Sequence, residues 1–151
     1  MHHLQAAMRG PVVALLALAL SGCVGFVPPY DVTLDTKSTT AFEGVSKIDA
    51  QVELGAFEGS ETYAKAEETY ADILTNLRVA DLRARSAPVS ERGATATARD
   101  QLSKLLTSCK DKVQTIARRH RTSGLAPDAG LTESMVSSCD LAATAARALK
   151  K

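Results

Sequence analysis

The clearest pattern in the chain is a repeat of apolar residues at spacings of three and four. Such spacing places apolar side chains along one face of an α-helix. We predict four helices from it, at about 41–55, 60–85, 91–121 and 128–150. The expected buried positions are Phe42, Val45, Ile48 and Val52 in the first helix; Tyr63, Ala66, Tyr70, Ile73, Leu77, Ala80 and Ala84 in the second; Leu102, Leu105, Leu106, Cys109, Val113, Ile116 and Ala117 in the third; and Met135, Cys139, Ala142, Ala146 and Leu149 in the fourth.

Local signals set the predicted helix boundaries. Thr40 and Glu43 are spaced as in a capping box, so we expect the first helix to begin beside them. The preceding segment 31–36 alternates between polar and apolar residues and is predicted to be extended. Pro88 is expected to end the second helix, and the segment 123–130 contains the glycines and proline of a turn.

Four amphipathic helices with short connections favour one architecture. We predict an all-α protein, an antiparallel up-and-down four-helix bundle that follows a short extended tether. The bundle is expected to occupy residues 40–151. Its stripes are rich in alanine, and each alanine buries little area, so the core should be thin.

The N-terminus carries a short apolar run. Residues 10–20 read GPVVALLALAL, about half the roughly 20 apolar residues that a membrane-spanning helix needs. This length is typical of the hydrophobic region of a signal peptide.

The run ends in Leu20-Ser21-Gly22-Cys23, which resembles the lipobox of bacterial lipoproteins. The resemblance implies a signal peptide at 1–22, cleavage before Cys23, and acyl chains such as palmitate on that residue. Residues 23–39 would then form the lipidated N-terminus and tether. An ordinary signal peptide with an incidental cysteine, or an uncleaved anchor, are the alternatives. Val24 and Gly25 follow the cysteine where inner-membrane lipoproteins carry aspartate, so the expected location is the outer membrane, facing the periplasm.

Charge is distributed unevenly along a nearly neutral chain. Residues 23–81 contain 4 basic and 11 acidic side chains, whereas residues 82–151 contain 13 basic and 6 acidic ones. In one interpretation, the acidic segment 23–81 packs against the basic segment 82–151. In the other, the basic face meets an anionic lipid, glycan or partner protein.

Two cysteines remain once Cys23 is acylated. If the third helix ends near Thr122, Cys109 lies 13 residues, or about 20 Å, before its end; if Asp128 caps the fourth helix, Cys139 lies 11 residues, or about 16 Å, beyond that cap. Neighbouring helices would place the two cysteines at similar levels. The oxidising compartment of an exported protein favours a disulfide between them. We predict a disulfide that stabilises the fold by about 3 kcal/mol. Two buried free thiols, or a metal or redox role, are the alternatives.

One basic cluster is the candidate binding site. Arg118, Arg119, His120 and Arg121 occupy consecutive positions near the end of the third helix. They are either cations that complement the helix dipole, or a basic tip for peptidoglycan or an acidic envelope protein. We predict no catalytic residues, no metal site and no cofactor, because His120 is the only histidine left after cleavage and no catalytic motif occurs.

These observations define an expected function class. We expect a membrane-anchored, non-enzymatic envelope lipoprotein that acts as an interaction or accessory module. A lipoprotein that binds a small ligand between its helices and an immunity-type, toxin-neutralising envelope protein are the alternatives. Nucleic acid is not an expected partner in this compartment.

Overall fold

The computed structural model describes residues 31–86, 93–127 and 129–149. It contains the helices α2 (Val32–Glu53), α3 (Tyr63–Arg85), α4 (Ala94–Ser123) and α5 (Ala129–Ala148). A short 3₁₀ helix, η1 (Ser60–Thr62), immediately precedes α3. No strand is found in these described segments.

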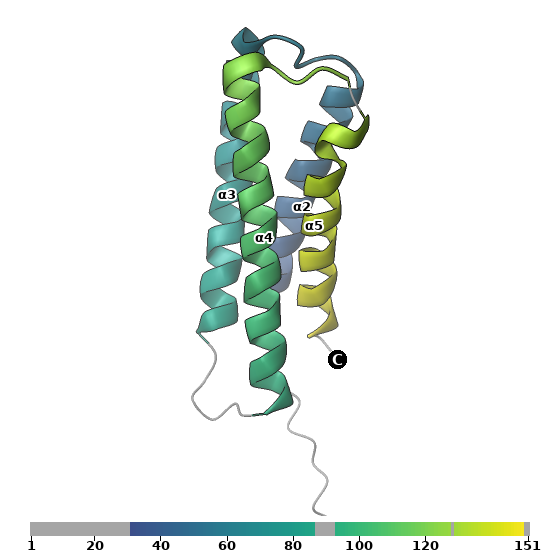
Figure 1. The fold of residues 1–151 in the computed structure, drawn as a ribbon. Coiled ribbons are helices and arrows are strands. Elements are labelled where there is room, and N and C mark those ends of the chain that lie inside the picture. The colour runs from purple at the N-terminus through teal and green to yellow at the C-terminus, as the bar shows by residue number, and fades with distance from the viewer. Residues whose placement is uncertain (1–30, 87–92, 128, 150–151) are drawn as a thin grey trace, which may run out of the picture.

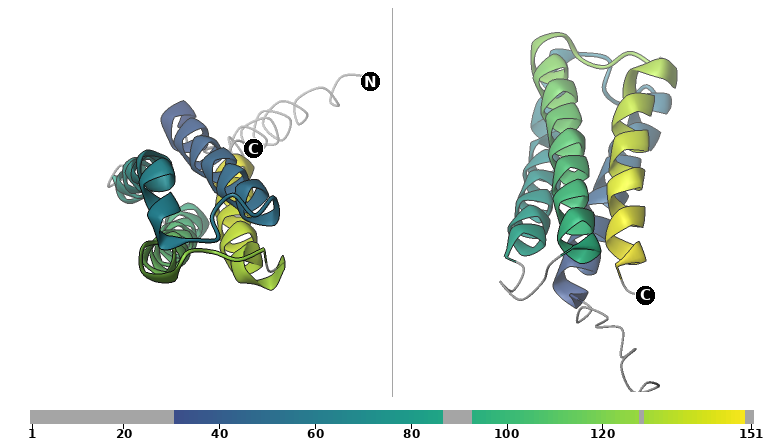
Figure 2. Two further views of the ribbon diagram at one scale, coloured as in Figure 1. Left: turned by 90° about the horizontal axis from the view of Figure 1, so that it is seen from above. Right: turned by 60° about the horizontal axis from the view of Figure 1, so that its bottom comes forward.

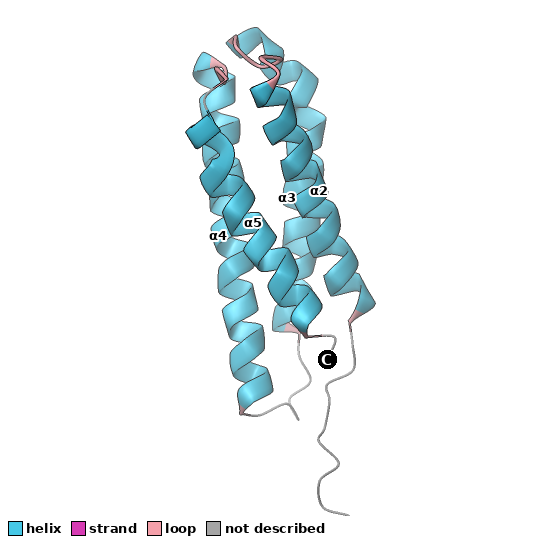
Figure 3. Ribbon diagram, turned by 90° about the vertical axis from the view of Figure 1, so that its right-hand side faces the viewer, coloured by secondary structure: helices cyan, strands magenta, loops and turns pink. Residues whose placement is uncertain are grey.

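The four long helices form a bundle. Helix α2 packs against α3, α3 against α4, α4 against α5, and α5 closes the bundle by packing against α2. Figures 1 and 2 show the 54–62 and 124–127 connections together at one end, which we call the turn end. The start of α2, the end of α3, the start of α4 and the end of α5 lie at the other end, the Asp31 end (Figure 3). The predicted four-helix bundle is confirmed.

Helix α2 begins earlier than the sequence pattern predicted. The Asp31 carboxylate accepts a hydrogen bond from the Leu34 N–H at 3.0 Å, which is the geometry of a helix N-cap. The predicted extended tether and the bundle boundary at residue 40 are therefore wrong for residues 32–39, which are helical. Thr40 is exposed in mid-helix and caps nothing. Residues 23–30 lie outside the described residues.

Ser38 explains how the apolar stripe of α2 extends back to Leu34. Its side chain is buried, and its hydroxyl donates to the Leu34 carbonyl at 2.7 Å. The polar group is thus satisfied inside its own helix, so serine occupies a core position without an unpaired hydroxyl.

The other helices match their predicted ranges closely. Helix α3 begins after η1, which itself starts at the expected residue Ser60. Helix α4 runs from Ala94 to Ser123, and α5 from Ala129. Pro88 and Asp128, which were expected to act at the boundaries, lie outside the described residues.

The predicted stripes form one hydrophobic core. Four predicted positions, Phe42, Tyr63, Leu105 and Leu149, are only partly buried, and the others are fully buried. The buried alanines concentrate in α3 (Ala66, Ala80 and Ala84) and α5 (Ala142, Ala143 and Ala146), and each of them buries little area.

A disulfide crosses this core between α4 and α5. The sulfur atoms of Cys109 and Cys139 are 1.98 Å apart, and their Cα atoms are 4.7 Å apart. Both residues are buried. The predicted pairing is confirmed, and closing a loop of 30 residues stabilises the fold by roughly 3 to 4 kcal/mol on the chain-entropy account.

The two connections at the turn end are held together by backbone contacts. The Leu125 N–H donates to the Phe57 carbonyl, and both side chains are buried. Gly124, with φ of 73°, ends α4 and lies against the backbone of Glu58. This contact fixes the end of α4, where the predicted basic cluster lies.

Candidate functional site

Three adjoining hollows form a groove along the surface between α3 and α4. Their volumes are about 560, 510 and 320 Å³, from the Asp31 end to the turn end. Thr107 lines the first and second hollows, and Leu74 and Gln114 line the second and third. We call the combined feature the α3–α4 groove.

Apolar side chains form the floor of the groove. Leu77, Ala84, Leu106 and Ala117 are buried core residues that also line it. Leu82 lies on the rim with 58% of its surface exposed. Of the leucines that line the groove, partly buried Leu74 and exposed Leu82 are therefore the ones that an occupant can contact.

The rims are strongly basic. Seven cations and two carboxylates line the groove. The cations are Arg78, Arg85, Arg99, Lys104, Lys110, Arg118 and Arg121. Like charges concentrated along a furrow with an apolar floor produce a positive potential that attracts anions.

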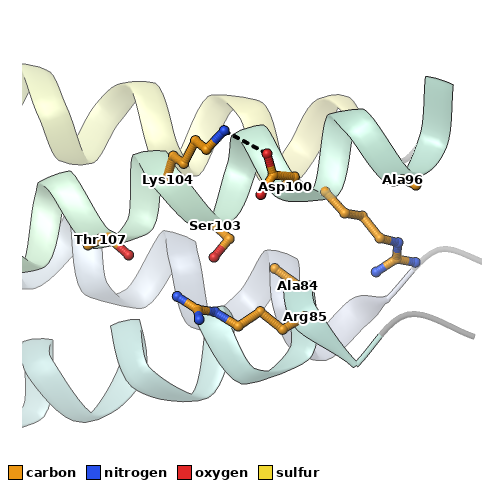
Figure 4. A pocket seen from close by; sticks show the side chains of 8 residues that line it. Ala84, Arg85, Ala96, Asp100, Ser103, Lys104 and Thr107 are labelled. Carbon is orange, nitrogen blue, oxygen red and sulfur yellow. Dashed lines mark ion pairs between the residues drawn. The ribbon is translucent and has the colours of Figure 1, made fainter. Parts of the chain in front are cut away.

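Both carboxylates already have cationic partners. Asp81 accepts from Arg85 Nε at 2.9 Å and from the Ser103 hydroxyl at 2.6 Å, the second contact linking α3 to α4. Asp100 pairs with Lys104 at 2.7 Å, as Figure 4 shows. Within the described segments, Arg78, Lys110, Arg118 and Arg121 make no ion pair, so their charge is available to an anionic partner.

The structure divides the predicted basic cluster into three environments. Arg118 and Arg121 line the turn end of the groove, and the Arg121 guanidinium lies 5.7 Å from the centre of the Tyr63 ring. Arg119 is exposed but does not line the groove. His120 is fully buried and therefore cannot contact a partner at the surface.

His120 occupies an aromatic pocket at the turn end. The centre of its ring lies 4.6 Å from that of Phe57, 5.6 Å from Tyr63 and 5.9 Å from Tyr70. Its Nε2 lies 2.8 Å from the Thr62 hydroxyl, and its Nδ1 lies 3.3 Å from the Tyr70 hydroxyl.

The hydrogen-bond pattern assigns the tautomer of His120. The Thr62 hydroxyl donates its single proton to the Gly59 carbonyl, so it accepts from the Nε2–H of His120. Nδ1 then carries the lone pair and accepts from the Tyr70 hydroxyl. Burial lowers the pKa of His120, and burial together with the nearby Tyr63 raises the pKa of Tyr70. The neutral imidazole thus acts as a structural bridge between η1 and α3.

The described segments contain neither a metal-ligand cluster nor a membrane-spanning helix. The part of the chain that the structure describes holds no group of three or more His, Cys, Asp or Glu side chains placed to bind a metal ion. No helix among residues 31–86, 93–127 and 129–149 is long and apolar enough to cross a bilayer. Cys23, the predicted lipidation site, lies outside the described residues.

The comparisons with protein-family models, curated proteins and solved structures found no match. The groove is therefore the feature from which a function can be proposed.

Most residues of the groove were missed in the sequence. Only its two residues from the basic cluster, Arg118 and Arg121, were candidates. For the other residues that line the groove, the clue in the sequence was their position next to the apolar stripes of α3 and α4. Lys110, Gln114, Arg118 and Arg121 recur at spacings of three and four, which places them along one edge of α4. Arg78 and Arg85 lie seven residues apart, two turns along α3.

Proposed function

We propose that this protein is a lipid-anchored, non-enzymatic module of the bacterial envelope that binds an anionic partner through the α3–α4 groove. The single observation that supports binding is the basic groove, in which cations without ion-pair partners flank an apolar floor. The resemblance of Leu20-Ser21-Gly22-Cys23 to a lipobox supports the anchor, and Val24 and Gly25 after the cysteine favour the outer membrane, facing the periplasm.

The location of the hollows favours an interaction module over a carrier of small ligands. All three lie on the surface between two helices, whereas a carrier needs a cavity among the facing stripes. An immunity-type role would also use a concentrated charged surface, so it remains a special case in which the anionic partner is a toxin.

Site-specific photo-crosslinking in living cells tests the proposed function. A photoreactive amino acid replaces Gln114, an exposed residue inside the groove, or Thr144, an exposed residue on α5. We expect a discrete crosslinked species from position 114 that is absent from position 144, because only the first faces the groove.

Two further results decide the interpretation of this experiment. The crosslinked species should weaken in a variant that carries Lys110→Glu and Arg118→Glu, since both cations line the groove. Equal crosslinking from positions 114 and 144, or none from either at native expression levels, would contradict the proposal.

A further inference from the structure

The α3–α4 groove is long and continuous. Its lining on α4 runs from Ala96 to Arg121, which corresponds to about 37 Å at 1.5 Å per residue. Figure 1 shows α3 and α4 side by side along most of this length, with the start of α4 extending beyond the end of α3. A groove of this length suits an elongated occupant better than a compact one.

The groove carries two different recognition elements along the same line. Cations lie on both rims, with Arg78 on α3 and Lys110 and Arg118 on α4. The apolar residues Leu74, Leu77 and Leu106 lie between them. An occupant that satisfies both elements needs an apolar face bordered by negative charges.

Other anionic occupants fit this arrangement less well. A flexible polyanion would pair with the cations but leave the apolar floor uncovered. A sugar polymer usually stacks on exposed aromatic rings, and Tyr63, the one aromatic residue among those that line the described groove, already contacts Arg121. A flat membrane surface cannot enter a furrow between two helices.

We infer that the α3–α4 groove binds an acidic amphipathic helix of a partner protein. The apolar face of that helix covers Leu82 and the floor, and its acidic flanks pair with the rim cations, which is the helix-in-groove mode of recognition. The inference rests on the proposed function and names the class of partner for the same site.

Titration with designed peptides tests the inference. The full chain is purified in mild detergent and titrated with a synthetic helix of about 25 residues, long enough to span the groove. Its sequence places leucine at heptad core positions and glutamate on both flanks. A second peptide has every glutamate replaced by glutamine, and a third has the same composition in scrambled order.

We expect the acidic helix to bind at least about tenfold more tightly than either control peptide, because only it presents both charge and an apolar face. Binding should weaken as salt increases.

Matched variants locate the binding surface. Lys110→Glu with Arg118→Glu should weaken binding by about tenfold or more, because both cations line the groove. Lys112→Glu with Arg119→Glu makes the same charge change on the same helix outside the groove. This control pair should change binding by less than about threefold at physiological salt, since screening limits the reach of its charges.

A second pair of variants tests the apolar contact. Leu82→Ser should weaken binding, whereas Leu141→Ser, on α5 and similarly exposed, should not. Circular dichroism checks that each variant is folded.

A polysulfated glycan serves as the competing ligand. If the glycan binds through Lys110 and Arg118 and the helical peptide does not bind, the helical partner is refuted. The proposed function, binding of an anionic partner by the groove, is then still supported. If the scrambled peptide binds as tightly as the ordered one, the helical requirement is overturned. If neither ligand responds to the groove variants, both the inference and the proposed function fail.

Discussion

His120 shows how a single residue can be misread from its neighbours in sequence. It stands between three arginines, yet its side chain is fully buried whereas theirs are exposed. A helical turn rotates successive side chains by about 100°, so adjacent residues face different directions. Both ring nitrogens of His120 have hydrogen-bond partners, which makes burial of the neutral ring inexpensive.

The lowered pKa of His120 predicts a dependence of stability on pH. Between about pH 7 and pH 5, the unfolded chain takes up a proton on this imidazole with a pKa near 6.5, while the folded protein resists protonation. The folded state therefore loses stability as the pH falls through this window, by up to about 1.4 kcal/mol per pH unit. Urea unfolding at pH 7, 6 and 5 measures this slope.

A variant without the imidazole provides the comparison. His120→Gln should be less stable at every pH, but its free energy of unfolding should change less between pH 7 and pH 5. An identical slope in the two proteins would show that His120 does not cause the effect.

At the scale of secondary-structure elements, the sequence predicted the features that hydrophobic periodicity determines, which are the buried faces of the helices. The stripes of α3, α4 and α5 and the Cys109–Cys139 pair were predicted, because helical spacing alone determines which side chains face inward. The start of α2 was missed because buried Ser38 interrupts the apolar pattern, and its hydroxyl is satisfied by a bond that sequence does not display. The groove was missed because it depends on how two helices lie side by side.

The connection after α4 predicts a large effect from a small change. Gly124 has a positive φ, and a Cβ there would lie 2.2 Å from the Glu58 carbonyl oxygen. Gly124→Ala should therefore lower the free energy of unfolding by more than about 2 kcal/mol, through backbone strain and displacement of the adjoining connection. Equilibrium denaturation measures this loss.

Gly93 supplies a matched control at the other end of the bundle. Its φ is the same, 73°, but a Cβ there meets no atom within 4 Å. Gly93→Ala should lower the free energy of unfolding by less than Gly124→Ala does, because it introduces only backbone strain of about 1–3 kcal/mol and no steric overlap. Equal losses at the two positions would mean that the contact with Glu58 contributes nothing.

For the whole molecule, near-neutrality conceals a local concentration of charge. The ion pairs Asp81–Arg85 and Asp100–Lys104 each join residues four apart in one helix, so they do not hold helices together. Cations from α3 and α4 instead gather along their shared groove. A protein can thus carry almost no net charge and still attract an anion strongly at one face.

The proposed anchor predicts where the whole molecule is found in cells. Replacing Cys23 by serine removes the thiol that would carry lipid, so the variant should appear unprocessed or in the soluble fraction. Two or three acyl chains give far stronger attachment than the single chain that binds reversibly. Membrane fractionation and the mass of the mature protein measure the outcome, and a Cys23→Ser protein that stayed processed and membrane-bound would refute the anchor.

The early start of α2 sets how far the bundle would lie from a membrane that holds the proposed lipid anchor. Seven residues, 24–30, separate Cys23 from the capping residue Asp31. Even fully extended, the eight Cα–Cα steps from Cys23 to Asp31 span at most about 29 Å. With Cys23 acylated, the Asp31 end of the bundle stays within that distance of the bilayer, and the groove adds about 37 Å. If the anchor and the helical partner are both as proposed, that partner presents its helix within roughly 65 Å of the lipid surface, and components confined to greater distances are excluded as partners.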